Sequence, residues 1–413
     1  MITRVSIKNF KSIYNLNNLE VGRVNIFIGE NGSGKSNFLE ALVFVSAFQS
    51  NKLDNEFLVS RGLRVPENNL MKSAFKENNK ENIKIIINDD EYYEFKSSDD
   101  NYSQWIHVSE EKAIEYIKES DKLNDFLRQT LKNNILDNID ESKYKISPET
   151  LKSDTFINKV ITKVMNNETF TEKLMEKLKT DVILKTRKDL YKDSLENFLI
   201  YSPENTALRT FEKEGQIQPL GINGEGLLKL LKVVNSYEDK SYINTIIESL
   251  KLFDWFEDII IPESLSFGED KIVISDRYLF DKIDQRSTNE GFLFILFYIT
   301  LIVAKETPKA FAIDNIDASL NPKLCTKLMI IICELAKKYD KQIFLTTHNP
   351  AILDGIDLND KEQKLFVVSR NKLGHTIMRN IRPVDRPKSS DDEYLNLSES
   401  FLRGYIGGLP KGF

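Results

Sequence analysis

The stretch Gly29-Glu30-Asn31-Gly32-Ser33-Gly34-Lys35-Ser36 decides how this chain is organised. An apolar run at 24–28 precedes it and a helical pattern follows it, so the glycine-rich loop joins a strand to a helix. Glycines let the backbone curl until several N–H groups point at one anion, beside a helix N-terminus that also favours negative charge. The spacing predicts a nucleotide phosphate site, with Lys35 at the outer phosphates and the Ser36 hydroxyl as a ligand of Mg²⁺. The residues predicted to bind ATP are Gly29, Glu30, Asn31, Gly32, Ser33, Gly34, Lys35, Ser36 and Asn37.

Length and composition indicate a reduced, membrane-free protein of more than one lobe. The chain has 413 residues, a formal net charge of −6 and 29% charged residues. This mildly acidic composition does not indicate a nucleic-acid or membrane partner. The two cysteines, Cys325 and Cys333, have no partner at metal-ligand spacing and read as reduced apolar residues. The most apolar run, 292–304, is too short to span a bilayer and is expected to be a buried helix or strand. We expect a cytoplasmic protein.

The order of apolar runs predicts an α/β fold. Strands are expected at 1–7, 16–21 and 24–28, a hairpin at 83–87 and 91–95, and further strands at 310–313, 343–345 and 365–368. Helical patterns at 322–338 and 350–356 separate the last three runs. Strands that alternate with helices favour a mainly parallel sheet flanked by helices, here with an N-terminal antiparallel portion. In such sheets the ligand binds at the carboxyl ends of the strands.

The chain is predicted to have four parts. Residues 1–96 and 201–390 form the two halves of the nucleotide-binding head. Between them, residues 97–200 show apolar positions at three- and four-residue spacing among charges of both signs, which predicts an insertion of several short helices. The tail, 391–413, carries a short amphipathic segment, which either docks on a partner or, as we expect, folds back on the core of the chain.

Two polar residues follow predicted strands at the edge where the loop lies. Asp314 comes directly after the run 310–313 and is placed to hold Mg²⁺. His348 follows the run 343–345, where a neutral imidazole can hydrogen-bond the terminal phosphate or the attacking water. The alternatives are a carboxylate that caps the next helix and a structural histidine.

These residues carry a resemblance to a known group. The loop 29–36, the segment Asp314-Asn315-Ile316-Asp317-Ala318-Ser319-Leu320-Asn321-Pro322 and the segment Thr347-His348-Asn349-Pro350 resemble the ATPase core of the RecF, SMC and overcoming-lysogenization-defect group. Phe10-Lys11-Ser12-Ile13 also resembles the first hairpin of that group. These are ABC-type ATPases, often classed in bacteria with the AAA family, and many serve in DNA repair or anti-phage defence. The resemblance covers roughly residues 1–50 and 200–370, while the insertion and the tail match no pattern.

The resemblance implies a homodimer in which two heads hold ATP between them. Each nucleotide would lie between the loop of one head and the signature segment of the other, which precedes the helix before Asp314. That place holds Thr288, Asn289, Glu290 and Gly291, a departure from the usual Leu-Ser-Gly-Gly. Backbone N–H groups at the start of the next helix would meet the opposing γ-phosphate. The alternative for this segment is an ordinary helix cap.

A second departure concerns hydrolysis. The group places Glu directly after the Asp, where it polarises the attacking water, whereas this chain has Asn315. An amide orients a water molecule but cannot accept its proton. Asp317 is the nearest carboxylate that could substitute, so Asp314, Asn315, Asp317 and His348 are the candidate catalytic residues. We expect slow or gated hydrolysis with a long-lived ATP-bound dimer.

Three functions fit these observations to different degrees. The first is an ATP-driven switch that senses nucleic acid or a phage product and controls a separately encoded nuclease or toxin. The second is an ATPase of DNA repair or chromosome maintenance that binds DNA itself, and the third and weakest is the nucleotide domain of an ABC transporter. The sequence ends 65 residues after His348, too soon for the Toprim nuclease domain of the overcoming-lysogenization-defect proteins. We therefore expect the effector partner, a nuclease or a toxin, to be separately encoded, while DNA or RNA stays open as a further partner and no membrane contact is expected.

Overall fold

The computed structural model describes residues 1–50, 52–65, 68–75, 81–89, 91–97, 105–107, 195, 197–210, 217–261, 272–388 and 393–409. The chain divides into two compact units. The first comprises Met1–Tyr93, Asp99–Trp105 and Asp193–Phe413, and the second comprises Glu94–Ser98 and Ile106–Lys192. Almost all of the second unit lies outside the described residues, so the helical insertion stays a prediction. The described part of the predicted insertion, 97–200, includes the strand Trp105–His107 and the first residue of the strand Ile200–Tyr201.

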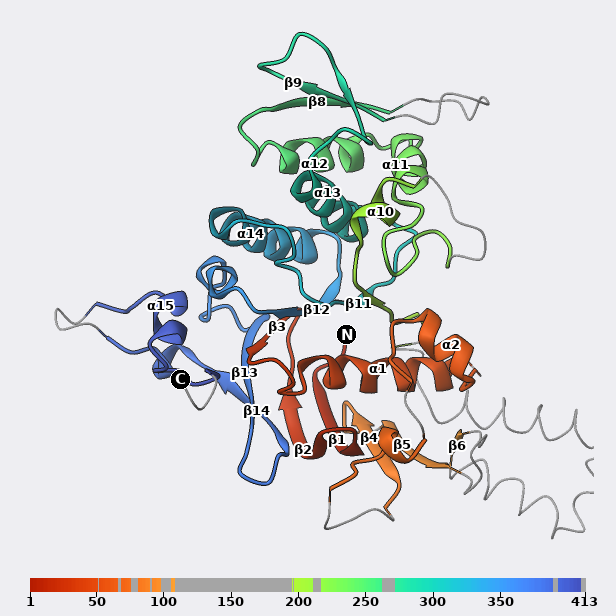
Figure 1. The fold of residues 1–413 in the computed structure, drawn as a ribbon, viewed down its shortest axis with the longest axis vertical. Helices are drawn as coiled ribbons and strands as arrows, with labels where there is room; N and C mark the ends of the chain where they lie inside the picture. The colour runs from red at the N-terminus through yellow and green to blue at the C-terminus, as the bar shows by residue number, and fades with distance from the viewer. Residues whose placement is uncertain are drawn as a thin grey trace, which may run out of the picture. The chain divides into compact units, whose positions relative to one another are not determined.

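The described strands form three sheets, of which the two larger ones position the site (Figure 1). The strands are β1 (Arg4–Phe10), β2 (Ile13–Glu20), β3 (Val24–Gly29), β4 (Ile83–Ile87), β5 (Glu91–Ser97), β6 (Trp105–His107), β7 (Ile200–Tyr201), β8 (Phe256–Ile260), β9 (Val273–Asp276), β10 (Ile283–Asp284), β11 (Ala310–Ile313), β12 (Gln342–Thr347), β13 (Gln363–Arg370) and β14 (Thr376–Ile381). A six-stranded sheet has the order β14-β13-β3-β12-β11-β7, in which only β14 is antiparallel to its neighbour. A five-stranded sheet has the order β2-β1-β4-β5-β6, and β1 pairs antiparallel with both β2 and β4. The expected α/β class, with a mainly parallel sheet and an antiparallel N-terminal portion, is confirmed.

Helices cover both faces of the parallel sheet. They are α1 (Lys35–Gln49), α2 (Asn55–Ser60), α3 (Asn68–Met71), α10 (Asn205–Leu208), α11 (Leu227–Asn235), α12 (Ser241–Leu250), α13 (Glu290–Val303), α14 (Pro322–Lys338), α15 (Leu397–Leu402) and the 3-10 helices η1 (Pro350–Gly355) and η2 (Pro383–Asp385). Alternate residues of the buried strands face opposite ways. Val24, Ile26 and Ile28 of β3 join the apolar cluster around α13 and α14. Phe27, between them, packs against Phe38 of α1, with ring centroids 4.8 Å apart.

The helix α13 is buried on every side. From Phe292 to Val303 each residue is at most 3% exposed, which is expected of a helix that is apolar all round rather than along one stripe. It packs against α12 and α14, and Figure 1 shows it stacked between them. The apolar run that is too short for a bilayer is therefore a core helix. No helix among the described residues combines the length and apolar character needed to cross a membrane.

Most predicted elements are present, with several differences. The strand β11 and the helix α14 have the predicted bounds. The first strand starts and ends three residues later than expected, so only Lys11 and Ser12 separate β1 from β2. The segment after His348 is a 3-10 helix rather than an α-helix. The small antiparallel sheet β10-β9-β8 and the edge strand β14 were not anticipated.

The tail folds back on the core, as expected. Leu397 and Phe401 of α15 are buried and belong to the main apolar cluster, as does Ile406. Ser398 donates to the Asp354 carboxylate of η1, which fixes the start of α15 against that helix. The opposite face of the segment, with Leu402 and Tyr405, is exposed.

One buried carboxylate holds the first hairpin to the loop helix. Glu40 of α1 is 1% exposed, and its Oε2 accepts from Lys11 Nζ at 2.6 Å. Its Oε1 accepts from Arg64 Nε at 2.7 Å and from the Arg64 backbone N–H at 3.2 Å. Burial lowers the pKa of Lys11, and the Glu40 carboxylate opposes that shift. Glu40 therefore compensates a cation that the fold has largely removed from water.

We predict that Glu40→Ala lowers the free energy of unfolding by about 3 kcal/mol, because removing one member of a buried ion pair leaves the other uncompensated. Urea unfolding of the purified chain measures the change. The matched control is Glu362→Ala, since Glu362 pairs with Arg23 at 3.2 Å but is partly exposed, and it should cost at most about 1 kcal/mol. Equal effects of the two substitutions would contradict the role assigned to Glu40.

Candidate nucleotide site

Three neighbouring strands bring the predicted site residues to one edge of the sheet. The strands β3, β12 and β11 lie side by side and parallel (Figure 1). The glycine-rich loop follows β3, His348 follows β12, and Asp314 follows β11. Because parallel strands end at the same edge, residues from distant parts of the sequence meet there. The edge therefore joins the two halves of the head that the insertion separates.

The loop closes around the side chain of Lys35. Its Nζ donates to the carbonyl oxygens of Gly29 at 2.9 Å and Glu30 at 3.0 Å. Gly34 has a φ of 104°, and a Cβ there would lie 2.2 Å from Thr376 Oγ1, so the position requires glycine. The buried Ser33 hydroxyl has no hydrogen-bond partner among the described residues. An unpaired hydroxyl in a curled loop is a feature that a bound phosphate oxygen would satisfy.

Side chains outside residues 29–36 hold the shape of the loop, and two of them, Thr376 and Arg370, have no local pattern that predicts this role. Thr376 of β14 donates from Oγ1 to the Ser33 carbonyl at 2.8 Å and shares a 2.7 Å hydrogen bond with Ser12. Asn37 donates from Nδ2 to Ser12 Oγ at 2.6 Å. Arg370 Nε donates to the Gly32 carbonyl at 2.7 Å. The loop is thus attached to the first hairpin and to the antiparallel edge of the sheet.

Asp314 lies beside the Ser36 hydroxyl. The two carboxylate oxygens of Asp314 are 3.2 Å and 3.1 Å from Ser36 Oγ. Thr346, fully buried at the end of β12, donates to Asp314 Oδ1 and accepts from the Asn315 backbone N–H at 2.9 Å. Oxygen donors at this separation suit a small hard cation such as Mg²⁺, which binds through one or two protein oxygens, water and phosphate. Within the described residues no group of three or more His, Cys, Asp or Glu could hold a metal ion.

Asp317 is engaged by the segment that carries His348. Its Oδ1 accepts from Thr347 Oγ1 at 2.7 Å and from the His348 backbone N–H at 3.2 Å. The Asn315 side chain is exposed, on a residue with a φ of 55°. Asp317 thus fixes the position of the His348 backbone, while Asn315 presents an amide to solvent at the same edge.

Burial sets the protonation of the two basic groups. Burial lowers the pKa of Lys35 to about 8, and the carboxylates of Asp314, Asp317 and Glu30 only partly oppose the shift. Burial also lowers the pKa of His348, and the Lys35 ammonium adds to that effect. At neutral pH the ammonium therefore carries its charge and the imidazole is neutral.

The signature-like segment forms the start of α13. The Asn289 side chain accepts from the Phe292 N–H at 2.9 Å and caps the helix, while Thr288 is buried and donates to the Asp284 carbonyl at 2.9 Å. Glu290 accepts from the Ser319 hydroxyl. A Cβ on Gly291 would lie 3.1 Å from the Ser319 carbonyl. The segment therefore contacts the loop that follows Asp314 in the same chain, and its role toward a second head stays a prediction.

A cavity of about 550 Å³ opens beside the glycine-rich loop. Its lining includes Ser12 and Asn37 next to the loop, the apolar Leu70 and Phe75, and the cations Lys11, Arg64, Lys72 and Arg370. A cavity of this size with apolar walls and cationic groups can receive the base and sugar of a nucleotide whose phosphates lie in the loop.

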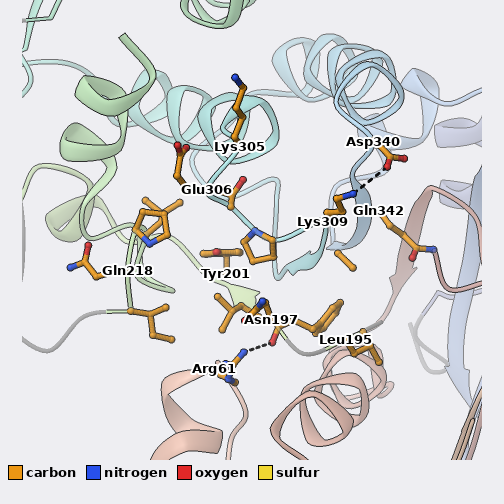
Figure 2. A pocket seen from close by; sticks show the side chains of 18 of the residues that line it. Arg61, Leu195, Asn197, Tyr201, Gln218, Lys305, Glu306, Lys309, Asp340 and Gln342 are labelled. Carbon is orange, nitrogen blue, oxygen red and sulfur yellow. Dashed lines mark hydrogen bonds and ion pairs between the residues drawn. The ribbon is translucent and has the colours of Figure 1, made fainter. Parts of the chain in front are cut away.

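A larger cavity, of about 700 Å³, lies at the other end of the strands (Figure 2). Its lining comes from the segments that precede β7, β11 and β12 and includes Tyr201 and Gln342. Its cations already have partners: Arg23 Nη1 lies 3.0 Å from Asp340, and Lys305 lies over the rings of Tyr237 and Tyr242. This cavity is lined by neither the curled loop nor Asp314.

Comparison with known proteins identifies one family. The model of the family described as "AAA ATPase domain" matches residues 1–353. No curated protein matches the chain significantly. Among solved structures, the chain is similar to an SmcHead bound to the C-winged helix domain of ScpA, with 14% identity, a TM-score of 0.49, and 92% of this chain and 98% of that chain covered.

Two further head structures are similar to the chain. One is the Smc head domain with an extended coiled coil bound to the C-terminal domain of ScpA, derived from Pyrococcus furiosus, with 15% identity, a TM-score of 0.46, and 92% and 96% of the two chains covered. The other is the SMC head domain from Thermotoga maritima, with 14% identity, a TM-score of 0.43, and 92% and 99% covered.

The pKa of Lys35 predicts how ATP affinity depends on pH. Phosphate charges favour the ammonium form, so binding requires proton uptake wherever the free chain holds a neutral amine. At pH 7 and below the free lysine is almost fully protonated, so its titration should not change the affinity there. From pH 7.5 to 9 we expect the Kd of a non-hydrolysable ATP analogue to rise about tenfold, measured by isothermal titration calorimetry. Lys35→Arg, whose charge persists over this range, should show a flat profile. A flat profile for the natural chain would contradict the lowered pKa.

Proposed function

Because the chain belongs to the AAA ATPase domain family, we propose that it is an ATP-dependent switch that binds ATP with Mg²⁺ and hydrolyses it slowly. The observation that carries the proposal is the meeting of Lys35, Ser36 and Asp314 at one edge of the sheet, with Asn315 in the position next to the carboxylate. The first three residues supply what binding a triphosphate requires. Asn315 limits the rate of ATP hydrolysis and therefore sets the lifetime of the ATP-bound form.

In this proposal the loop N–H groups and Lys35 hold the phosphates, and the cavity beside the loop receives the nucleoside. Ser36 would ligate Mg²⁺ directly, and Asp314, oriented by Thr346, would hold its water shell. The ion, when bound, neutralises charge that develops on the phosphates during transfer. The Ser33 hydroxyl would gain the partner that it lacks among the described residues.

Hydrolysis requires an oriented water molecule and a place for its proton. The neutral imidazole of His348 can hydrogen-bond the terminal phosphate or the water. Asn315 can orient that water but has no lone pair basic enough to take its proton. Asp317 has the charge of a base, yet its Oδ1 already accepts two hydrogen bonds from the His348 segment. We therefore assign Asp317 to positioning His348 and expect the chemical step to be slow.

Slow hydrolysis favours a long-lived ATP-bound form, which we propose is a homodimer. The start of α13, with its N–H groups and Gly291, would meet the terminal phosphate held by the other head. Glu290 and Gly291 contact Ser319 in the loop that also carries Asp317. Support for the arrangement comes from this placement and from the resemblance of the sequence to two-headed ATPases.

We predict that Asn315→Glu raises the ATP turnover number at least tenfold, because it adds the general base that Asn315 cannot supply. Phosphate release by the purified chain with ATP and Mg²⁺ measures the rate. Light scattering should show an ATP-dependent dimer that persists in the natural chain and decays faster in the variant. Lys35→Ala should show neither dimer nor turnover.

Asn315→Gln is the matched control. Residue 315 has a φ of 55°, which Asn tolerates better than Glu or Gln does, so both variants share the same backbone cost. Only the Glu variant gains a base, and only it should be faster. A natural chain that turns over above about 10 per second, or a Glu variant no faster than the Gln variant, would overturn the proposal of gated hydrolysis.

We propose further that the ATP-bound dimer controls a separately encoded effector, a nuclease or a toxin, in anti-phage defence or a related system. A state that persists between rare hydrolysis events suits a signal better than continuous mechanical work does. The Asn315 position supports this use of ATP, since it lengthens the time that each bound nucleotide maintains the dimer.

Affinity purification of the tagged chain from its native host tests the effector proposal. With ATP present, we expect a nuclease or toxin to co-purify with the natural chain and not with Lys35→Ala, and its activity to change when ATP is added. The alternative, an ATPase of DNA repair, predicts instead that no effector co-purifies and that the chain binds DNA with an affinity that falls steeply with salt. That second result would overturn the effector proposal.

A further inference from the structure

One arginine holds the segment that leads into α13. Arg209 lies directly after α10 and is partly exposed. Its Nη1 donates to the carbonyl oxygens of Gln285 at 2.8 Å and Arg286 at 2.6 Å, and its Nη2 donates to the Thr288 carbonyl at 2.8 Å. Its Nε donates to the Asn205 side chain at 2.8 Å, which fixes the guanidinium against α10. A planar fork of donors suits this task, because it can hold several carbonyl oxygens in fixed directions at once.

The helix that carries Arg209 is attached to the nucleotide edge of the sheet. Tyr201, at the end of β7, accepts through its carbonyl from the Asp314 backbone N–H at 2.9 Å. The short helix α10 follows β7 and packs against α13, and its Leu208 is fully buried in the main apolar cluster. Arg209 therefore connects the edge that holds Asp314 with the residues that precede α13.

The hydrogen bond to Thr288 sets the direction of the next backbone N–H. In a trans peptide unit the C=O and the N–H point to opposite sides. The Thr288 carbonyl is turned toward Arg209, so the Asn289 N–H points away from the guanidinium. Asn289 is exposed, and with Gly291 it lines a cavity of about 640 Å³ at the start of α13. The exposed Lys323 lines the same cavity, so an anion there would meet an ammonium group as well as backbone N–H groups.

We propose that Arg209 is the positioning residue of the signature-like segment: it draws the carbonyl oxygens of that segment inward and thereby turns the N–H groups at the start of α13 toward the terminal phosphate held by a second copy of this chain. Arg209 itself does not touch the nucleotide in this arrangement, because it acts through the peptide units that it orients. The inference rests on the proposed homodimer, and it names the side chain with which each head prepares its contact to the nucleotide of the other.

A second cation holds the opposite end of α13 and supplies a matched control. Lys341 is buried, and its Nζ donates to the carbonyl oxygens of Ala304 at 3.0 Å, Thr307 at 2.9 Å and Pro308 at 3.2 Å. Each of the two cations thus binds three backbone carbonyls next to one end of the same core helix. Only Arg209 holds the end that would face the second head, so the two substitutions separate a role in the dimer from a role in stability.

Hydrogen exchange of the full chain without nucleotide tests the positioning itself. In Arg209→Met, amide exchange over residues 285–293 should be faster by at least about tenfold, because the segment loses the donor to its carbonyls, while exchange over 300–308 stays unchanged. Lys341→Met should show the reverse pattern. Arg209→Lys, which keeps the charge but not the planar fork, is the milder variant and should change in the same direction as Arg209→Met. Unchanged exchange over 285–293 in both Arg209 variants would overturn the inference.

The ATP-dependent dimer tests the role toward the second head. With Mg²⁺ and a non-hydrolysable ATP analogue, light scattering should show a dimer dissociation constant raised at least about tenfold in Arg209→Met and at most about twofold in Lys341→Met. The affinity of the single chain for ADP should stay within about twofold in both variants. A purely structural arginine would leave the dimer constant unchanged, and that result would contradict the inference. A natural chain that forms no dimer would refute the proposed homodimer alone, because the exchange measurement needs no second head.

Discussion

The contact between the Ser36 hydroxyl and the Asp314 carboxylate depends on the register of three buried strands. Ile313 of β11 lies opposite Leu345 of β12, which lies opposite Ile26 of β3. Because side chains alternate along a strand, a slip of one residue would turn the apolar set of a strand to the wrong face of the sheet. The apolar cores on both faces thus fix the register, and the register places the polar ends. Core packing is in this sense the first determinant of the site.

Buried threonines hold the polar groups of the site in the positions that this strand register provides. Thr346 orients Asp314, Thr347 orients Asp317, and Thr376 holds the glycine-rich loop. All three are at most 3% exposed. A valine would fill the same space, but it would leave a carboxylate or a carbonyl without its donor in a place that water reaches poorly. The threonine hydroxyls therefore give the polar groups of the site defined hydrogen-bond partners. Glu40 has the same role for the cations beside the first hairpin.

The sequence predicted the elements that have a local pattern and missed those that depend on distant contacts. The strand at 310–313, the helix at 322–338 and the loop are each specified by adjacent residues, and the structure has them. The order of the apolar runs also placed Asp314 and His348 at the correct edge. Thr376 could not be assigned a role, since its partner Ser33 lies 343 positions away and its strand is an antiparallel addition to the sheet. The three-stranded sheet β10-β9-β8 was missed because its strands are short and only partly buried.

The placement of Asp317 changes how the departure at Asn315 is understood. From the sequence, a carboxylate two residues beyond Asn315 could replace the missing base. In the structure that carboxylate accepts from Thr347 and from the His348 backbone, so it is committed to holding the segment that must meet the phosphate. Its Oδ1 is therefore engaged by the segment that it positions. In the function we propose, Asn315 beside the Asp314 carboxylate and Asp317 in this positioning role together account for slow proton transfer from water and for a nucleotide that stays bound.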